Sequence, residues 1–250
     1  MNHHALVVFS GGQDSTTILA HALHLGFECE AIGFNYGQKH AVELEQAKKI
    51  ADKLKVPYRV VDMQAFGALV GRGTALVGDG GGWQVNAASP LKHMSTEVHA
   101  SFVPNRNAMM LTMAHGYAQI IGADTLWTGV CQTDYSGYPD CRKVFIDALE
   151  NALNVGYETN VQIITPLMFA TKAQTFKMAE DAHALDLVLE ESHTCYNGVR
   201  GQPIDDLDEN GMHELALVHR HDWGHGCGEC PACQLRAKGW EEYKAMVRIA

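Results

Sequence analysis

Residues 10–15 read SGGQDS, a short turn whose composition suits a phosphate group. The turn follows an apolar run at 5–9 and precedes an amphipathic run that begins at Thr16. A strand that enters a glycine-rich turn and then a helix gathers unpaired backbone N–H groups, and the helix dipole favours an anion beside them. Gly11 and Gly12 permit backbone torsions and a close approach that a side chain would block. The sequence therefore predicts a phosphate-binding turn.

The side chains of this turn add further polar groups. Ser10 and Ser15 supply hydroxyl donors, while Asp14 could hold a magnesium ion or cap the helix. The spacing matches neither GxxxxGK[ST] nor GxGxxG, so the turn belongs to neither of those two nucleotide-binding motifs. The plain alternative is an ordinary strand-turn-helix connection with a Ser or Asp cap.

Four cysteines have the spacing of a metal site. Cys227, Cys230 and Cys233 form CxxCxxC, and Cys195 lies 32 residues before them. Two-residue spacers let successive thiolates converge on one ion, so the pattern predicts a closed tetrahedral zinc site whose metal binding is part of folding. An iron–sulfur cluster and simple core cysteines stay open as alternatives. We favour zinc because nothing else in the sequence indicates redox work. The remaining cysteines are interpreted as one buried strand residue and two loop thiols: Cys29, Cys131 and Cys141.

Short apolar runs alternate with segments of helical period along most of the chain. Alternation of this kind predicts βαβ units and a Rossmann-like α/β fold, with a parallel sheet and helices on both of its faces. We expect strands at 5–9, 29–34, 58–61, 125–130 and 161–164, and helices at 15–25, 41–54, 106–121, 142–154, 172–183 and 234–247.

Two stretches interrupt this alternation. The glycine-rich stretch 67–101 predicts a long loop or insertion, and an acidic stretch around 205–214 predicts a solvated surface loop. We interpret the nearby His219, His221 and His225 as surface residues. A shift in composition after Cys195 predicts two units: an α/β domain over 1–190 and a zinc-binding subdomain with a terminal helix over 191–250.

Composition narrows the class of partner. The chain has 250 residues, 46% of them hydrophobic, enough for a sizeable core. Its net charge of −10 is a poor match for the nucleic-acid backbone, so a small substrate is the better expectation. The N-terminal apolar run is too short for a signal peptide or a membrane span, and the cysteine usage fits a reducing compartment. We therefore expect a cytoplasmic protein that binds neither membrane nor nucleic acid.

The SGGQDS turn resembles that of the pyrophosphatase-loop ATPases, a family that includes GMP synthetase and NAD synthetase. The resemblance implies an adenine nucleotide alpha hydrolase-like fold, cleavage of ATP between its α and β phosphates, and a substrate activated as an adenylate. It also implies that the turn and the start of the following helix bind ATP: Phe9, Ser10, Gly11, Gly12, Gln13, Asp14, Ser15, Thr16, Thr17, Ile18 and Leu19.

Further stretches resemble one branch of that family, the 7-cyano-7-deazaguanine synthases of queuosine precursor biosynthesis. They are FNYGQKH at 34–40, FVPNRN at 102–107, GVCQTDYSGYPDCR at 129–142, TPLMFATKAQT at 165–175, and SHTCYNG before CGECPACQLRAKG. The resemblance implies a carbon–nitrogen ligase that converts 7-carboxy-7-deazaguanine and ammonia into the nitrile in two ATP-dependent steps. It further implies Mg²⁺, one Zn²⁺ per chain and a homodimer.

Several charged and aromatic residues could serve this chemistry. Guanidinium and ammonium groups suit phosphates and carboxylates, which makes Arg106, Arg142 and Lys172 candidates for binding either anion. We take Asp14, Arg106 and Lys172 as the catalytic candidates. The substrate candidates are ring-stacking tyrosines, acids that accept from ring N–H groups, and one arginine: Asp134, Tyr135, Tyr138, Asp140 and Arg142.

The chain departs from the family pattern at a few positions. Asn105 stands where the family usually has Gly, Gln132 where Glu is common, and Phe169 where Trp is frequent. The segment between Gly198 and Gly226 is also longer and more acidic than in many relatives. Two other functions stay open: a tRNA-modifying or thiolating enzyme with the same turn, and a zinc-stabilised module that binds ATP without this chemistry.

Overall fold

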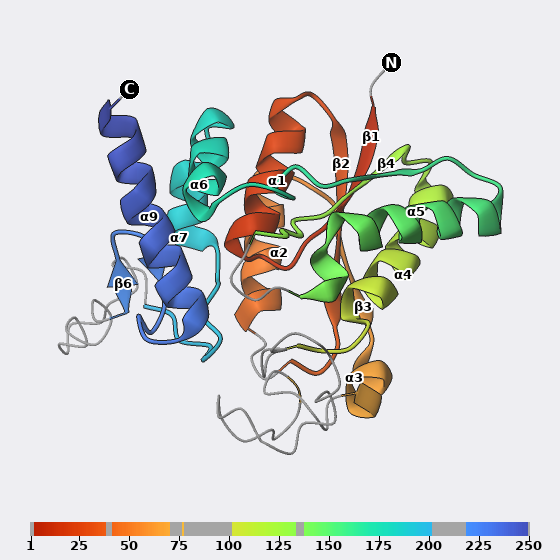
Figure 1. Ribbon diagram of the computed structural model, residues 1–250, viewed down its shortest axis with the longest axis horizontal. Coiled ribbons are helices and arrows are strands. Elements are labelled where there is room, and N and C mark those ends of the chain that lie inside the picture. The colour runs from red at the N-terminus through yellow and green to blue at the C-terminus, as the bar shows by residue number, and fades with distance from the viewer. Residues whose placement is uncertain are drawn as a thin grey trace.

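The computed structural model describes residues 3–38, 42–70, 77, 102–133, 138–201 and 219–249. Five parallel strands form the central sheet in the order β3-β2-β1-β4-β5 (Figure 1). Their bounds are β1 His4–Val8, β2 Glu28–Asn35, β3 Tyr58–Asp62, β4 Thr125–Trp127 and β5 Gln162–Ile164. Strand β1 is central: Ala5 pairs with Cys29 on one side and with Thr125 on the other.

Helices cover both faces of this sheet. Their bounds are α1 Gln13–His24, α2 Val42–Leu54, α3 Gln64–Val70, α4 Arg106–Ile121, α5 Lys143–Tyr157, α6 Lys172–Asp181, α7 Leu185–Glu191 and α9 Pro231–Ile249. Successive strand residues point to opposite faces, and β1 shows the consequence. Leu6 packs in the core beneath α4 and α5, whereas Ala5 and Val7 pack in the core beneath α1 and α2. The predicted α/β fold with helices on both faces is confirmed.

The element boundaries differ from the prediction in a few places. Helix α4 has the predicted bounds, whereas β4 ends at Trp127, three residues early. Helices α3 and α7 were not predicted, because each has only seven residues and too few turns for a helical period. Helix α3 takes up the first part of the predicted loop at 67–101, and most of that loop lies outside the described residues. The acidic stretch 205–214 lies outside them as well.

The C-terminal part packs against the α1 and α2 side of the molecule (Figure 1). Phe176 of α6 and Trp240 of α9 are buried with their rings 5.1 Å apart, and Gly239 lets α9 approach the start of α6 closely. A short hairpin, β6 Arg220–His221 and β7 Gly224–His225, lies beside them. Helices α6 and α9 therefore share one hydrophobic cluster, and the boundary at residue 190 stays a prediction.

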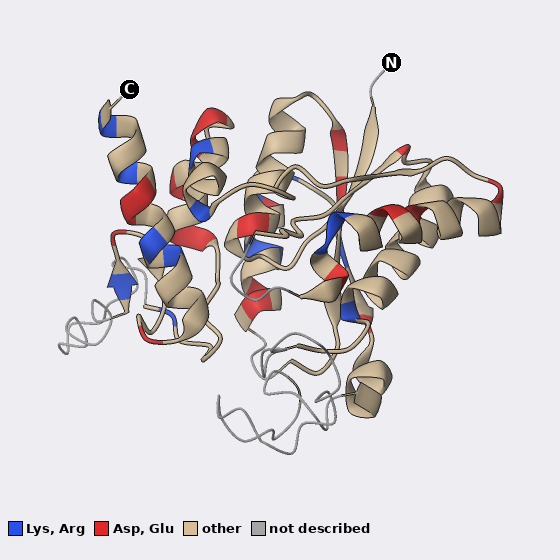
Figure 2. Cartoon of the chain, viewed as in Figure 1, with Lys and Arg blue, Asp and Glu red and all other residues tan. Residues whose placement is uncertain are grey.

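Charged residues of both signs lie on α6 and α9 (Figure 2). On α6, for example, Lys177 forms ion pairs with Glu180 and Asp181. None of the helices in the described residues is long and apolar enough to cross a membrane.

Candidate active site and metal site

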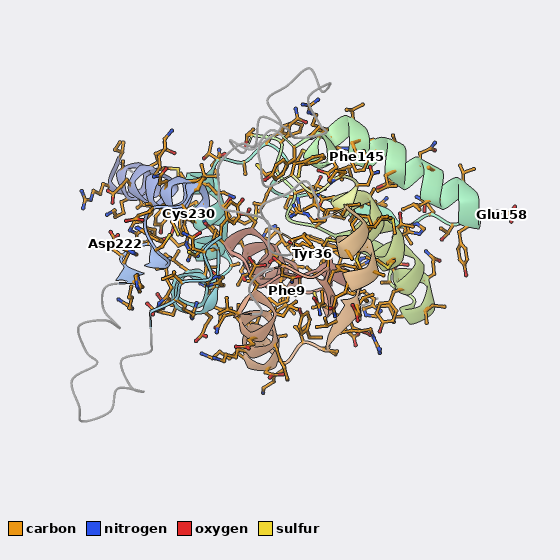
Figure 3. The ribbon with its side chains drawn as sticks, turned by 90° about the horizontal axis from the view of Figure 1, so that it is seen from below. Phe9, Tyr36, Phe145, Glu158, Asp222 and Cys230 are labelled. Carbon is orange, nitrogen blue, oxygen red and sulfur yellow. The ribbon has the colours of Figure 1, made fainter. Side chains whose placement is uncertain are left out.

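A cavity of about 330 Å³ opens at the carboxyl ends of β1, β2 and β4. The strand order reverses on the two sides of β1, so this is the switch point at which open α/β sheets bind their ligands. Residues 8–15 line one part of the cavity, except Gly11. Figure 3 labels Phe9 and Tyr36 in this region. The phosphate-binding turn thus lies where the fold predicts a ligand.

The SGGQDS turn is held by its own hydroxyl groups and by a close contact with α2. The Oγ atoms of Ser10 and Ser15 are 3.2 Å apart, and the Ser15 hydroxyl lies 3.2 Å from the Gly12 carbonyl oxygen. Gly11 has φ +77°, and a Cβ there would lie 2.7 Å from the backbone nitrogen of Ala47. Glycine is required because the turn passes directly over the α2 backbone.

Asp14 and Lys172 meet at the cavity from opposite elements. The Nζ of Lys172, the first residue of α6, lies 2.6 Å from Oδ2 of Asp14 in the first turn of α1. A capping box between Thr171 and Gln174 fixes the start of α6. The pair places a cation and a carboxylate beside the SGGQDS turn, and the catalytic roles of both residues stay predictions.

The residues predicted to bind ATP divide into two groups. Six line the cavity, namely Phe9, Ser10, Gly12, Gln13, Asp14 and Ser15. Gly11, Thr16 and Thr17 are buried beside the turn, and Ile18 and Leu19 belong to the hydrophobic core under α1. Among the described lining residues, Gln13 is notable because its side-chain amide is 2% exposed and has no hydrogen-bond partner in the structure. ATP contacts for 16–19 stay a prediction that the cavity does not support.

A second part of the cavity is aromatic and carries two charged groups. Tyr36, Tyr138 and Tyr196 line it together with Arg106 and Glu43. The guanidinium of Arg106 lies over the Tyr36 ring, 5.9 Å from its centroid. Burial raises the pKa of the Glu43 carboxyl to about 7, although Arg106 opposes this shift. The site can therefore enclose a flat ring between phenol groups and present both a carboxyl group and a guanidinium cation to it.

The predicted substrate residues have different positions. Tyr138 lines the cavity, but Asp140 and Arg142 are not among the residues that line it. Asp140 is 6% exposed and its Oδ2 accepts from the backbone N–H of Asn107 at 3.1 Å, which caps α4. The substrate contacts predicted for Asp140 and Arg142 stay predictions. Asp134 and Tyr135 lie outside the described residues.

Gln132, one of the departures from the family pattern, has a structural contact. Its side-chain oxygen accepts from the backbone N–H of Lys143 at 3.0 Å, at the start of α5. A glutamate oxygen at this position could accept the same hydrogen bond, so the replacement preserves the cap. Phe169, another departure, is 64% exposed.

The four predicted metal ligands come together. The sulfur atoms of Cys195, Cys227, Cys230 and Cys233 all lie within 4.8 Å of one another, and the Cys227 and Cys233 sulfurs are 3.9 Å apart. Four thiolates at about 2.3 Å from one zinc ion would be separated by about 3.8 Å, so the cluster fits a tetrahedral ion. Figure 3 labels Cys230 on the C-terminal side of the molecule. Gly226 is required here, because a Cβ would lie 2.5 Å from the Cys233 sulfur.

The thiols of Cys195, Cys230 and Cys233 shift one another's pKa values. Hydrogen bonds with the sulfurs of Cys230 and Cys233 lower the pKa of Cys195, and the hydrogen bond with Cys195 raises the pKa of Cys233. A divalent cation would stabilise every thiolate of the cluster at once.

The interpretation of three histidines as surface residues is wrong for His225. Its side chain is 3% exposed, because β7 turns it inward toward Glu190. His221 is half-buried and stacks on Trp223 with ring centroids 4.3 Å apart, and its Nε2 lies 3.1 Å from the Gly226 carbonyl oxygen. These rings support the backbone next to the metal site.

One segment joins the metal site to the phosphate-binding turn. The backbone N–H of His193 donates to the Gly11 carbonyl oxygen at 2.9 Å, and the N–H of Gln13 donates to Thr194 Oγ1 at 3.4 Å. Arg236 of α9 is fully buried and donates to the same Thr194 oxygen at 3.0 Å. Cys195, one of the four predicted metal ligands, follows directly. The cysteine cluster therefore anchors a wall of the cavity.

Sequence reasoning missed several residues of the cavity. Tyr36 and Glu43 flank β2 and α2, and His193, Thr194 and Tyr196 flank the first metal ligand. The position of Tyr36 directly after an apolar strand was the available signal, because such positions face the ligand crevice of an α/β sheet. The other four give no signal of this kind in the sequence.

A parallel sheet with a glycine-rich turn and a cavity at its switch point is the arrangement of nucleotide-binding α/β proteins. The model of the queuosine biosynthesis protein QueC family matches residues 4–244. The chain belongs to this family. It is thus a member of an enzyme family, as predicted.

Two relatives and one solved structure illustrate the similarity. The chain is 46% identical to the 7-cyano-7-deazaguanine synthase of Wolinella succinogenes over 97% of this chain and 94% of that one. It is 44% identical to the synthase of Helicobacter acinonychis over 96% of both chains. The NH3-dependent NAD synthetase of Campylobacter jejuni covers 97% of this chain and 84% of its own, at 14% identity and a TM-score of 0.42.

Proposed function

We propose that this protein uses ATP to convert 7-carboxy-7-deazaguanine and ammonia into 7-cyano-7-deazaguanine, the activity named for its relatives. The observation that carries the proposal is the composition of the cavity. One part is a phosphate-binding turn with a lysine, and the adjoining part is an aromatic site with an acid and an arginine. A nucleotide and a flat heterocyclic acid would therefore meet in one enclosure.

The chemistry needs two activations of the same carbon. The substrate carboxylate oxygen attacks the α-phosphorus of ATP and pyrophosphate leaves, which gives an acyl adenylate. Ammonia attacks the carbonyl carbon, and AMP and a proton leave, which gives the amide. The amide oxygen then attacks the α-phosphorus of a second ATP and a second pyrophosphate leaves, which gives an adenylated amide. Loss of AMP and two protons from this intermediate gives the nitrile.

We assign roles to this chain's residues from their positions. The turn at 10–15 and the N-terminus of α1 would bind the phosphates, and Lys172 would stabilise the charge that develops on them. Asp14 would hold Mg²⁺, a hard cation that prefers carboxylate oxygen. Arg106 would face the substrate part of the cavity. Four thiolates would hold Zn²⁺, which supplies structure to the wall at 193–196.

Mass spectrometry tests the proposal directly. Metal-loaded protein is incubated with 7-carboxy-7-deazaguanine, ammonium, magnesium and ATP, and the products are identified. We expect the nitrile together with AMP and pyrophosphate. Intact ATP and no amide or nitrile, from protein with a folded circular dichroism spectrum and one zinc per chain, would refute the assignment.

Three further expectations from the sequence and the family resemblance stay predictions. They are the homodimer, the cytoplasmic location and the division of the chain at residue 190. Sedimentation of the purified protein measures the first, and limited proteolysis near residue 190 tests the last.

A further inference from the structure

The described residues that line the cavity include two carboxyl groups, and these differ in their ion pairs. Asp14 is held by the Lys172 ammonium at 2.6 Å. Glu43, at the start of α2, makes no hydrogen bond or ion pair with the residues that the structure describes. Glu43 is therefore available to a ligand in a way that Asp14 is not.

Aromatic rings surround this acid. Tyr36 follows β2, and Tyr138 packs against Phe102 with ring centroids 5.5 Å apart (Figure 3 labels Tyr36). Tyr196 lines the same part of the cavity. Arg106 covers the Tyr36 ring and carries the nearest opposite charge to Glu43. Such a frame suits a flat heterocycle whose polar edge is directed at the acid.

The heterocycle of the proposed substrate has a distinctive edge. A guanine-type ring carries a ring N–H and an exocyclic amino group side by side, so two donors point in the same direction. An ionised carboxylate is an acceptor at both oxygens and matches this pair. Asp140 is less suited, because it already accepts from the backbone of Asn107 and does not line the cavity.

We propose that Glu43 is the specificity residue for the guanine-type edge, accepting hydrogen bonds from the ring N–H and the exocyclic amino group of the substrate. This inference rests on the proposed function and names a contact within it. The position of Glu43 supports the assignment, since its side chain is half-buried and lines the cavity. A bound ring would cover the carboxylate, and the two donors would then replace the water that it loses. Analogues that lack the amino group would leave a buried oxygen without a partner.

The test compares two substrates in three proteins. The substrates are 7-carboxy-7-deazaguanine and the matching hypoxanthine-type acid, which lacks the amino group. The proteins are the unchanged chain, Glu43→Gln, and Glu45→Gln as a control on an exposed residue of the same helix turn. The measured quantity is the ratio of kcat/KM for the two acids.

We expect the unchanged protein and Glu45→Gln to prefer the guanine-type acid by roughly 100-fold or more. In Glu43→Gln the ratio should fall by at least about tenfold, because the amide offers one acceptor and turns a donor toward the substrate's donors. An equal loss on both acids, with the ratio unchanged, would overturn the proposal.

Two further outcomes are informative. If Glu43→Gln does not turn over, the same ratio is measured as dissociation constants by calorimetry without ATP. If the unchanged protein makes nitrile from both acids equally well, this inference fails while the proposed function stands. If it makes no nitrile from either acid, the proposed function fails, and calorimetry then decides whether Glu43 still selects the guanine-type ring.

Discussion

Replacing Thr194 by valine should destabilise the protein, because the change removes one oxygen that accepts hydrogen bonds from two buried donors. Thr194 Oγ1 accepts from the Arg236 guanidinium at 3.0 Å and from the Gln13 N–H at 3.4 Å. Arg236 is 0% exposed and Gln13 is 2% exposed, so water cannot replace the lost acceptor. An unsatisfied buried donor costs about 1–3 kcal/mol, and the longer bond contributes less. We expect a loss of about 2–3 kcal/mol.

Urea unfolding at a fixed zinc concentration measures this loss. With a slope of about 3 kcal/mol per molar urea, the midpoint should fall by roughly 1 M in Thr194→Val. Thr194→Ser keeps the oxygen and should stay within about 1 kcal/mol of the unchanged protein. Because Gln13 belongs to the phosphate-binding turn, the KM for ATP should also rise in the valine variant. A midpoint for Thr194→Val equal to that of Thr194→Ser would refute this reasoning.

Three other changes test separate parts of the structure. Gly226→Ala should reduce bound zinc to well under one ion per chain, because its Cβ would lie 2.5 Å from the Cys233 sulfur. In the control Gly156→Ala, the Cβ meets nothing within 4 Å, so this variant should keep its metal. Elemental analysis measures the zinc content of both variants. Lys172→Met should lower kcat by roughly 100-fold or more through loss of phosphate stabilisation, while the exposed Lys177→Met should not. Glu43→Gln should become more stable relative to the unchanged protein as pH rises. The folded-state pKa of Glu43 is about 7 against a usual 4.5, so the folded state loses stability between these values as the unfolded state ionises first. That shift is worth at most about 3 kcal/mol at 1.36 kcal/mol per pH unit.

Each of these changes has a result that would count against it. Full zinc content in Gly226→Ala would mean that the loop yields without disturbing the cluster. Equal kcat in the two lysine variants would remove Lys172 from phosphate stabilisation. The free energy of unfolding is measured at pH 4.5 and at pH 8 in the unchanged protein and in Glu43→Gln. An equal change between the two pH values in both proteins would refute the prediction for Glu43. The groups that set its ionisation are Arg106 and Cys195, with the tyrosines at 36, 138 and 196 lining the same part of the cavity.

Local patterns in the sequence were enough to predict the fold class and the metal cluster. The strand-turn-helix at Ser10 and the two-residue cysteine spacers are short-range features, and their geometry depends on few other residues. The alternation of apolar runs likewise predicted the parallel sheet, because strand and helix periods are local. Cys195, which lies 32 residues before the first of the other three cysteines, was also predicted, and its sulfur lies in the same cluster.

The cavity wall could not be predicted in the same way. Glu43 reads as an ordinary acid in the first turn of a helix, and its place in the cavity wall, near Arg106 of α4, depends on tertiary packing. Asp140 shows the opposite case, since a backbone N–H of α4 already binds the acid that seemed suited to a ligand by residue type. His225 was taken for a surface residue because its burial depends on β7 and α7 meeting. Tertiary packing decides all three.

The central position of β1 sets an order in which the site can be assembled. Strand β1 pairs with β2 across about 24 residues that include α1, but with β4 across about 120 residues. The last wall of the cavity, at 193–196, is fastened by cysteines near the C-terminus. Contacts this distant in sequence form late, and a chain leaving the ribosome exposes its N-terminal half first. The phosphate-binding turn thus forms early, and the cavity around it is completed last. A chain whose C-terminal part has not yet folded would have the turn at 10–15 without the wall at 193–196 that hydrogen-bonds to it.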